Sequence, residues 1–221
     1  MNVSMIQQTL QSKFKFNEPI FTDELLKAFP NKSRPQVFRY IEQAKANDIL
    51  TQYDTGVYYL PTKTALGKSI ITAGEIAEKK YLTDGDDVYG IYSGITLLNG
   101  FHVTTQMAMV ETIVTNNETS KKREILIKKR RFILKKSRCK IDKNNYASYV
   151  VLELFNCIDS DERISKYVVK TVVEFIKEKS IGIMDIANMA KNFPSKAVKN
   201  LMRSGVIDEL IRETVHTRYK N

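Results

Sequence analysis

The sequence contains few of the residues that metal and redox chemistry require. Among its 221 residues are two cysteines, Cys139 and Cys157, and two histidines, His102 and His216. Their spacing matches no metal-ligand motif. We therefore interpret both thiols as buried or incidental, and we expect neither a metal site nor a cofactor.

Signals for membrane insertion are missing as well. No apolar run in the sequence approaches the length of a membrane span. Residues 1–8 contain neither the basic region nor the apolar region of a secretory signal. The sequence thus predicts a cytoplasmic protein that has no membrane partner.

Motifs of common enzymes are also absent. The sequence has no glycine-rich phosphate loop. The glycines of residues 90–94 stand at the wrong offsets for a hydrolase nucleophile elbow, so we interpret Ser93 as a helix cap. A solvated turn is a simpler interpretation than a metal site for the clustered carboxylates Asp84, Asp86 and Asp87. We expect no catalytic residue and no enzymatic activity.

Residues 20–61 have the order of elements that is typical of a winged helix-turn-helix. Thr22 can cap a helix over residues 23–29, which Pro30 ends. After a short turn, Ser33 can cap a second and longer helix. This order predicts the two helices of a DNA-binding motif.

The second helix, which we expect to continue to about residue 47, has an apolar side and a polar side. Arginine can bond guanine and glutamine can bond adenine, and residues near the start of a recognition helix reach base edges. The candidate DNA-binding residues are Lys32, Ser33, Arg34, Gln36, Arg39, Tyr40 and Gln43. We favour DNA binding here, and a protein contact with a solvated polar face is the alternative.

A hairpin, or wing, is predicted after these helices. Residues 49–53 and 57–60 favour strands and flank a turn signal at residues 54–56. Residues 1–62, which we interpret as the DNA-binding domain, contain seven Lys or Arg and six Asp or Glu. Phosphate neutralisation supplies much of the affinity for DNA. We therefore expect this domain to act as a homodimer or with help from another part of the chain.

The net charge of +10 is concentrated in one segment. Residues 121–143 contain 12 basic and two acidic residues, whereas the rest of the chain has 23 of each. Apolar triplets at residues 125–127 and 132–134 alternate with the charges and predict two short strands. The predicted basic surface consists of Lys128, Lys129, Arg130, Arg131, Lys135, Lys136 and Arg138. A solvated face is one interpretation, but the mutual repulsion of these charges favours an anionic partner, either nucleic acid or an acidic protein.

Residues 63–221 are interpreted as a second domain, which follows a linker over residues 62–68. An α/β layer is predicted over residues 72–140, with a helix over residues 72–80 and strands over residues 88–92 and 111–115. Helical periodicity extends over residues 145–221. Residues 183–207 partly repeat the N-terminal helix pair. Because no wing follows them, we favour a packing pair over a second DNA-binding motif. The predicted fold class is α+β.

The middle of the chain resembles a known family. Residues 89–100 read Tyr-Gly-Ile-Tyr-Ser-Gly-Ile-Thr-Leu-Leu-Asn-Gly, and the runs Thr104-Thr105-Gln106 and Val114-Thr115-Asn116 follow them. This pattern is similar to the core of AbiEi-type antitoxins of type IV toxin-antitoxin systems. Such antitoxins also carry a basic strand pair where this chain has residues 123–138. With the N-terminal motif, the resemblance covers about residues 1–140.

The resemblance implies two activities. The winged helix would bind the promoter of its own operon and repress it. Residues 63–221 would form an antitoxin domain that neutralises a nucleotidyltransferase-like toxin, by direct or indirect antagonism, with a role for the basic surface. The chain departs from the family pattern at Phe101-His102 and at Met107-Ala108-Met109, where a proline is expected. The alternative function is a stand-alone winged-helix transcriptional regulator whose C-terminal domain senses a ligand or a protein.

Overall fold

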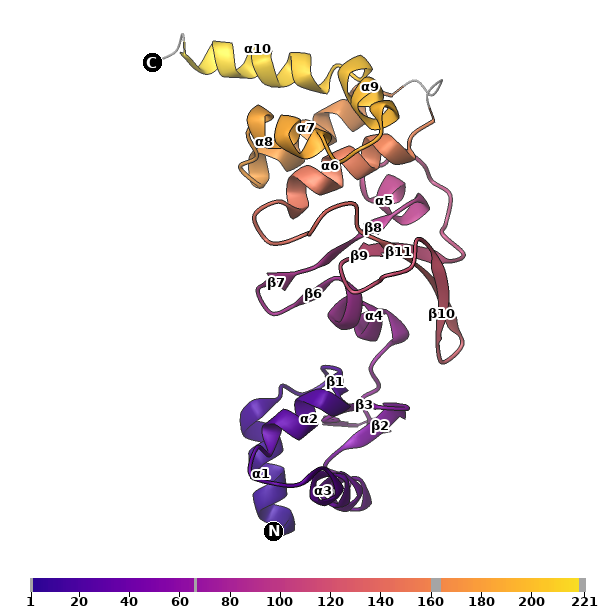
Figure 1. Ribbon diagram of the computed structural model, residues 1–221, viewed down its shortest axis with the longest axis vertical. Coiled ribbons are helices and arrows are strands. Elements are labelled where there is room, and N and C mark those ends of the chain that lie inside the picture. The colour runs from indigo at the N-terminus through magenta and orange to yellow at the C-terminus, as the bar shows by residue number, and fades with distance from the viewer. Residues whose placement is uncertain (1, 66, 160–163, 219–221) are drawn as a thin grey trace. The chain divides into compact units, whose positions relative to one another are not determined.

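A computed structural model describes residues 2–65, 67–159 and 164–218 (Figure 1). The described residues form a mixed α+β structure with ten helices and four small sheets, which confirms the α+β class. The chain divides into two compact units, Met1–Lys79 and Lys80–Asn221. This division falls later than the boundary that we expected after residue 62.

The first unit combines three helices with a three-stranded antiparallel sheet of order β1-β3-β2. Its elements are α1 (Val3–Lys13), β1 (Ile20–Phe21), α2 (Thr22–Ala28), α3 (Arg34–Ala46), β2 (Thr51–Asp54) and β3 (Val57–Tyr59). One cluster of buried apolar side chains joins them, including Ile6, Leu10, Leu25, Val37, Ile41, Leu50 and Leu60. The two helices and the hairpin expected for residues 20–61 are therefore present in the expected order.

Helix α1 was not predicted from the sequence. Ile6 and Leu10 are four residues apart, so they lie on one side of the helix, and both are buried in the unit's core. The remaining residues of α1 are mostly polar, so its apolar pattern is short. A helix with so little apolar surface is stable chiefly because the core accepts these two side chains.

Thr22 does not cap α2 as we predicted. It is the first residue of the helix, and Phe21 before it donates its backbone N–H to Glu24 Oε2 at 2.7 Å. The Thr22 hydroxyl instead donates to the Gly56 carbonyl at 3.3 Å. Gly56 lies in the β2–β3 turn with φ of +74°, a conformation that favours glycine. Thr22 therefore joins α2 to the hairpin.

The predicted linker is a small hairpin that belongs to the first unit. Its strands are β4 (Lys63–Thr64) and β5 (Gly67–Lys68). The Tyr59 hydroxyl donates to the Ser69 carbonyl at 2.9 Å, and Thr62 N donates to Ser69 Oγ at 2.9 Å. Because these bonds tie the predicted linker to the first unit, the boundary between the units lies beyond it.

Helix α4 (Ala73–Tyr81) follows, close to the prediction of a helix over residues 72–80. Thr72 and Glu75 form a reciprocal cap at its start, because the backbone N–H of each is bonded by the side chain of the other. Lys79 Nζ donates to the Pro19 carbonyl at 2.8 Å and to Glu24 Oε1 at 2.7 Å. These bonds connect the helix to the first unit.

The second unit contains a four-stranded sheet of order β10-β11-β9-β8. Strands β11 and β9 are parallel, and the other neighbours are antiparallel. The elements of this part are β6 (Thr83–Asp84), β7 (Asp87–Val88), β8 (Gly90–Ser93), α5 (Ile95–Gly100), β9 (Glu111–Thr115), β10 (Arg123–Ile127) and β11 (Arg130–Lys136). The predicted strand over residues 111–115 and the two predicted basic strands are confirmed.

The single strand that the sequence predicts over residues 88–92 is divided between β7 and β8. Tyr89 N and Gly90 N both donate to the Leu82 carbonyl, at 2.8 and 3.1 Å. This contact brings the backbone so close that a Cβ on Gly90 would lie 2.0 Å from the Tyr81 carbonyl oxygen. Gly90 is therefore required here for lack of space.

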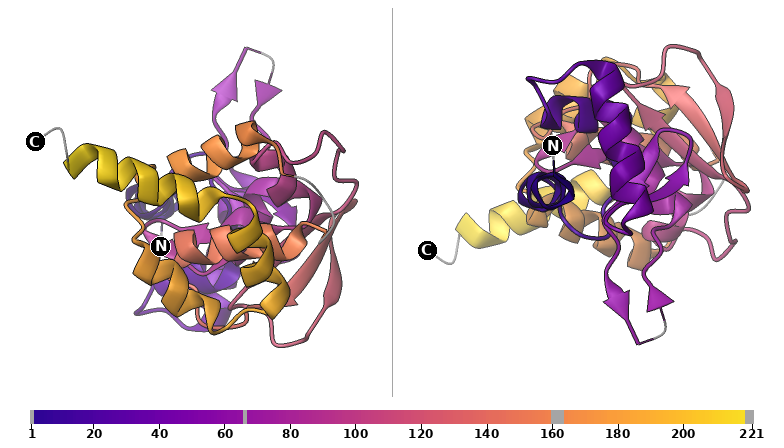
Figure 2. Two further views of the ribbon diagram at one scale, coloured as in Figure 1. Left: turned by 90° about the horizontal axis from the view of Figure 1, so that it is seen from above. Right: turned by 90° about the horizontal axis from the view of Figure 1, so that it is seen from below.

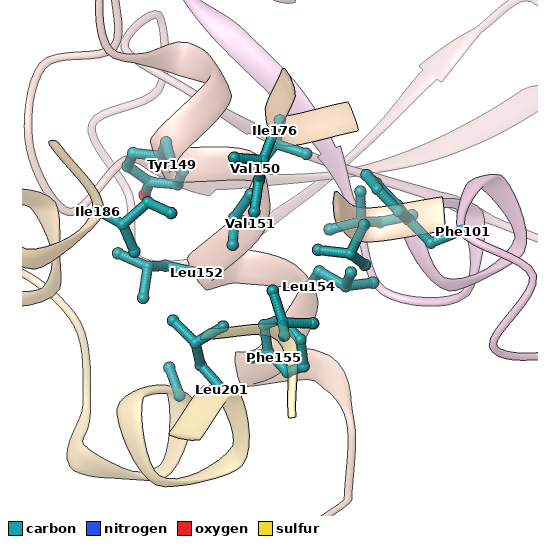
Figure 3. Close-up of a cluster of buried hydrophobic side chains, with 14 of the residues drawn as sticks. Phe101, Tyr149, Val150, Val151, Leu152, Leu154, Phe155, Ile176, Ile186 and Leu201 are labelled. Carbon is teal, nitrogen blue, oxygen red and sulfur yellow. The ribbon is translucent and has the colours of Figure 1, made fainter. Parts of the chain in front are cut away.

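Helices form the remainder of the second unit, as the periodicity predicted. They are α6 (Tyr146–Cys157), α7 (Lys166–Glu178), α8 (Ile183–Ala190), α9 (Ser195–Arg203) and α10 (Val206–Arg218). Helix α6 is central, since nine of its 12 residues are buried. Figure 3 shows its side chains between Ile186 of α8, Leu201 of α9 and Phe101. Seen from above, the C-terminal end of α10 projects beyond α6–α9 (Figure 2).

Residues 183–207 pack as a helix pair against α6. The buried face of α9 carries Ala197, Asn200 and Leu201. Asn200 Nδ2 donates to the carbonyls of Phe155 and Ile158, each at 3.0 Å. In the part of the chain that the structure describes, a further helix follows α9 and no hairpin does. The packing-pair interpretation agrees with these contacts.

Candidate functional site

Helix α3 presents an exposed surface opposite the core of the first unit. Its apolar residues Val37, Ile41 and Ala44 are buried, as the sequence pattern predicted. Six of the seven candidate DNA-binding residues are exposed: Lys32, Ser33, Arg34, Gln36, Arg39 and Gln43. We call these six, together with Phe38, the α3 surface.

Tyr40 does not belong to the α3 surface, contrary to our prediction. It is half-buried, and its ring meets Phe29 edge-on at 5.5 Å between ring centroids. It packs against the apolar cluster of the first unit. Successive residues of a helix are about 100° apart, so Tyr40, three residues after Val37, lies only about 60° from it around the helix axis. Its ring therefore points toward the core side that Val37 and Ile41 share.

Gln36 has a structural partner at the start of α3. Ser33 N donates to Gln36 Oε1 at 3.0 Å, so the glutamine carbonyl caps the first turn. Reading adenine bidentately requires the carboxamide to accept one hydrogen bond and to donate another. While Oε1 accepts from Ser33 N, its second lone pair and the Nε2 hydrogens remain for a base, but the cap fixes the direction in which the carboxamide points. This local bond weakens the prediction that Gln36 discriminates bases.

Phe38 is a residue of this surface that the sequence analysis missed. It is 37% exposed, and the guanidinium of Arg34 lies over its ring at 5.8 Å from the centroid. Arg34 and Phe38 are four residues apart and so share one side of the helix. Arg39 points about 140° away from Arg34 around the helix axis. The two arginines therefore reach opposite edges of the α3 surface.

The hairpin beside α3 is held by polar contacts. Lys45 Nζ, on the last turn of α3, donates to Gln52 Oε1 of β2 at 2.9 Å and pairs with Glu42 at 3.0 Å. Thr55 N, in the turn, donates to Asp54 Oδ1 at 2.7 Å. The helix and the hairpin are thus connected through side chains as well as through the core.

Strands β10 and β11 form what we call the basic hairpin, residues 123–136. Lys128 and Lys129 make its two-residue turn, in which Lys128 has φ of +50°. Phe132 and Leu134 are fully buried on one face of β11. Lys128, Lys129, Arg130, Arg131, Lys136 and Arg138 are exposed, whereas Lys135 is half-buried.

The seven predicted basic residues do not form one patch. Arg130 and Lys136 are six residues apart on an extended strand, which is about 20 Å. Side chains alternate along a strand, so Arg131 and Lys135 point to the opposite face from Arg130. Arg138 lies past the strand, where its guanidinium stacks over the Phe193 ring at 5.4 Å. Lys128, Lys129, Arg130 and Arg131 remain together, and we call these four the hairpin tip.

Acidic neighbours position the arginines of the basic hairpin. Ion pairs join Arg130 to Glu111 at 2.9 Å, Arg131 to Glu124 at 3.6 Å and Arg123 to Glu118 at 2.8 Å. The backbone N–H of Ser120, and then Arg123, hold the pKa of the buried Glu118 carboxyl below its usual range.

The loop between α5 and β9 directly precedes β9, the strand that pairs with β11 of the basic hairpin. Met107 is 88% exposed and Met109 is 94% exposed. The backbone here forms neither helix nor strand. In the sequence this position differs from the resembled family only in lacking a proline. The sequence signal that could have identified these exposed residues is a pair of methionines in a segment without helix or strand periodicity.

Ser93 is not a helix cap, contrary to our prediction. It ends β8 and is fully buried, and its hydroxyl donates to Glu153 Oε1 at 2.6 Å. Gly94 N donates to the Cys157 thiol at 3.3 Å. Burial raises the pKa of Cys157, and it also raises that of Cys139. Both thiols are therefore poor nucleophiles at neutral pH.

The other residues considered for chemistry lie apart. The His102 ring packs at a tilt of 54° against Tyr167, with 5.4 Å between ring centroids, and the side chain of His216 lies outside the described residues. Asp84 and Asp87 occupy opposite positions in the register of the β6–β7 hairpin. Across the described ranges, no three His, Cys, Asp or Glu side chains converge as metal ligands would.

None of the described helices combines the length and the apolar character needed to cross a membrane.

No family model, curated protein or solved structure matches the chain.

Proposed function

We propose that the first unit is a winged helix-turn-helix module that binds DNA through the α3 surface. In this proposal α2 and α3 are the helix pair and the β2–β3 hairpin is the wing. Lys32, Arg34 and Arg39 are exposed and of the types that contact phosphates and guanine. The exposed cationic face of α3 beside an anchored hairpin is the observation that carries the proposal.

We further propose that the protein is an antitoxin of a type IV toxin-antitoxin system, related to the AbiEi type. The α3 surface would bind the operator and repress the operon, and two copies would share the DNA. The second unit would neutralise a nucleotidyltransferase-like toxin through the hairpin tip. Both roles are binding rather than catalysis, and both partners would be met in the cytoplasm. Support comes from the residue pattern at positions 89–100 and from the exposed cations of the tip.

Co-expression with the reading frame adjacent to the gene tests this function. The adjacent product should arrest growth when expressed alone, and the full chain should restore growth. The full chain should also lower expression of a reporter placed under its own upstream region. An adjacent product without toxicity, or toxicity that the chain does not relieve, would overturn the antitoxin proposal.

The second candidate function is a stand-alone winged-helix regulator that senses a small ligand. It is favoured by a pocket of about 480 Å³ between α8 and the segment before α6. Polar side chains line it, including Asp142, Asn144, Asn145, Ser148, Asp185 and Asn188. In that case the reporter would respond to the chain, but co-expression with the adjacent product would have no effect on growth.

A further inference from the structure

Two nearly fully exposed methionines distinguish the loop between α5 and β9. Met107 and Met109 are more exposed than the other exposed large apolar residues of the described chain. Apolar side chains gain free energy when they leave water, and exposed apolar surface often marks an interaction site. Methionine also adapts to irregular surfaces and is enriched where proteins meet.

The methionines lie beside the hairpin tip. Glu111, which begins β9, pairs with Phe132 in register and forms the 2.9 Å ion pair with Arg130. Met109 precedes Glu111 by two residues and Met107 by four. Even a fully extended chain therefore keeps their Cα atoms within about 7 and about 14 Å of Glu111 Cα. The loop and the tip share one end of the sheet.

A third exposed apolar residue lies on the hairpin itself. Leu126 is 65% exposed and stands opposite Arg131 in the β10–β11 register. Directly opposite residues of an antiparallel pair have neighbouring side chains on the same face. Apolar and cationic side chains are thus interleaved at this end of the sheet.

We infer that Met107, Met109 and Leu126 form, with the hairpin tip, one docking surface for a folded acidic protein. The inference rests on the proposed antitoxin function, in which that protein is the toxin. Charge complementarity selects an acidic partner, because the four cations of the tip outnumber the carboxylates of Glu111 and Glu124 that pair with its two arginines. The apolar residues select a protein that offers an apolar cleft inside its acidic rim, because interfaces have an apolar centre and a polar border.

The residue types favour a protein over nucleic acid. Single-stranded nucleic acid binds through phosphate charge and through bases that stack on exposed aromatic rings. Phe132, the aromatic residue of the basic hairpin, is fully buried. Methionine and leucine side chains add nothing to a phosphate contact, whereas they fill a cleft on a protein.

The test compares three variants of the full chain in co-expression with the adjacent reading frame. The first is Met107→Ser with Met109→Ser. The second is Lys128→Glu with Lys129→Glu. The matched control is Met184→Ser with Met202→Ser, because both residues are exposed methionines of the same unit and lie on α8 and α9. Binding to the purified adjacent product is measured alongside, together with peroxide oxidation of each methionine.

The first and second variants should each bind the purified adjacent product at least about tenfold more weakly and fail to restore growth. The control should behave like the unmodified chain. Bound adjacent product should slow oxidation of Met107 and Met109 but not of Met184 and Met202. Growth rescue by the methionine variant, with equal oxidation in free and bound states, overturns the inference and leaves the antitoxin proposal standing. Loss of rescue that is accompanied by tight binding to RNA or DNA at the tip overturns it in favour of a nucleic acid partner. If the unmodified chain gives no rescue, the antitoxin proposal fails first.

Discussion

Ser93 donates its hydroxyl hydrogen to the carboxylate of Glu153 at 2.6 Å, and both residues are buried. The bond joins the end of β8 to the middle of α6 across 60 residues of sequence. Asn156 Nδ2 donates to the second carboxylate oxygen at 3.3 Å. A buried carboxylate depends on such donors, because it has lost its contact with water.

Replacing Ser93 by Ala is therefore expected to destabilise the second unit by about 1 to 3 kcal/mol, since Glu153 Oε1 loses its hydroxyl donor and keeps only the weaker Cys157 thiol at 3.8 Å. Urea denaturation of the full chain, followed by fluorescence and circular dichroism, measures the change. Ser120→Ala is the control, because Ser120 is exposed in the same unit. Equal stability of the two variants would mean that the bond contributes nothing to the fold.

Arg34 and Arg39 should both contribute to operator binding. Replacing either by Ala should cost about 1 to 3 kcal/mol if it reads a guanine, and the loss should depend on sequence. Lys15→Ala serves as the control, since Lys15 is exposed on the same unit outside α3. Gel-shift titration with the upstream region gives the affinities. Wild-type binding by both arginine variants would remove α3 from the interface.

Gln36 should act on stability more than on sequence choice. Replacing Gln36 by Ala removes the acceptor for Ser33 N and should destabilise the first unit by about 1 kcal/mol. Gln36→Glu keeps an acceptor at the same place and should retain the stability. Thermal melting of both variants separates the two roles. An unchanged melting temperature together with an altered base preference would instead identify Gln36 as a base reader.

The two activities should separate at the boundary between the compact units. A fragment of residues 80–221 should protect cells from the adjacent product but leave the promoter unrepressed. A fragment of residues 1–79 should bind the operator weakly, because it contains ten basic and eight acidic residues and so carries little net charge. With three or four phosphate contacts, log affinity would fall with log salt at a slope of about −3 to −4. Tight operator binding by residues 80–221 alone would reverse this division of roles.

The sequence by itself determined most element types in this protein, because periodicity and turn residues act over a few neighbours. The strand at β9, the basic hairpin and the C-terminal helices follow from patterns that are complete within each element. The burial of Val37 and Ile41 follows in the same way. Charge segregation into residues 121–143 is likewise a property of composition.

Only the tertiary structure decided which side chains are available for binding. Tyr40 is of a suitable type, but it packs on Phe29 in the core of the first unit. Ser93 resembles a helix cap until Glu153, far away in the sequence, is brought beside it. The position of Met109 at the hairpin tip likewise depends on the pairing of β9 with β11. These outcomes depend on partners that are distant along the chain, which local patterns do not specify.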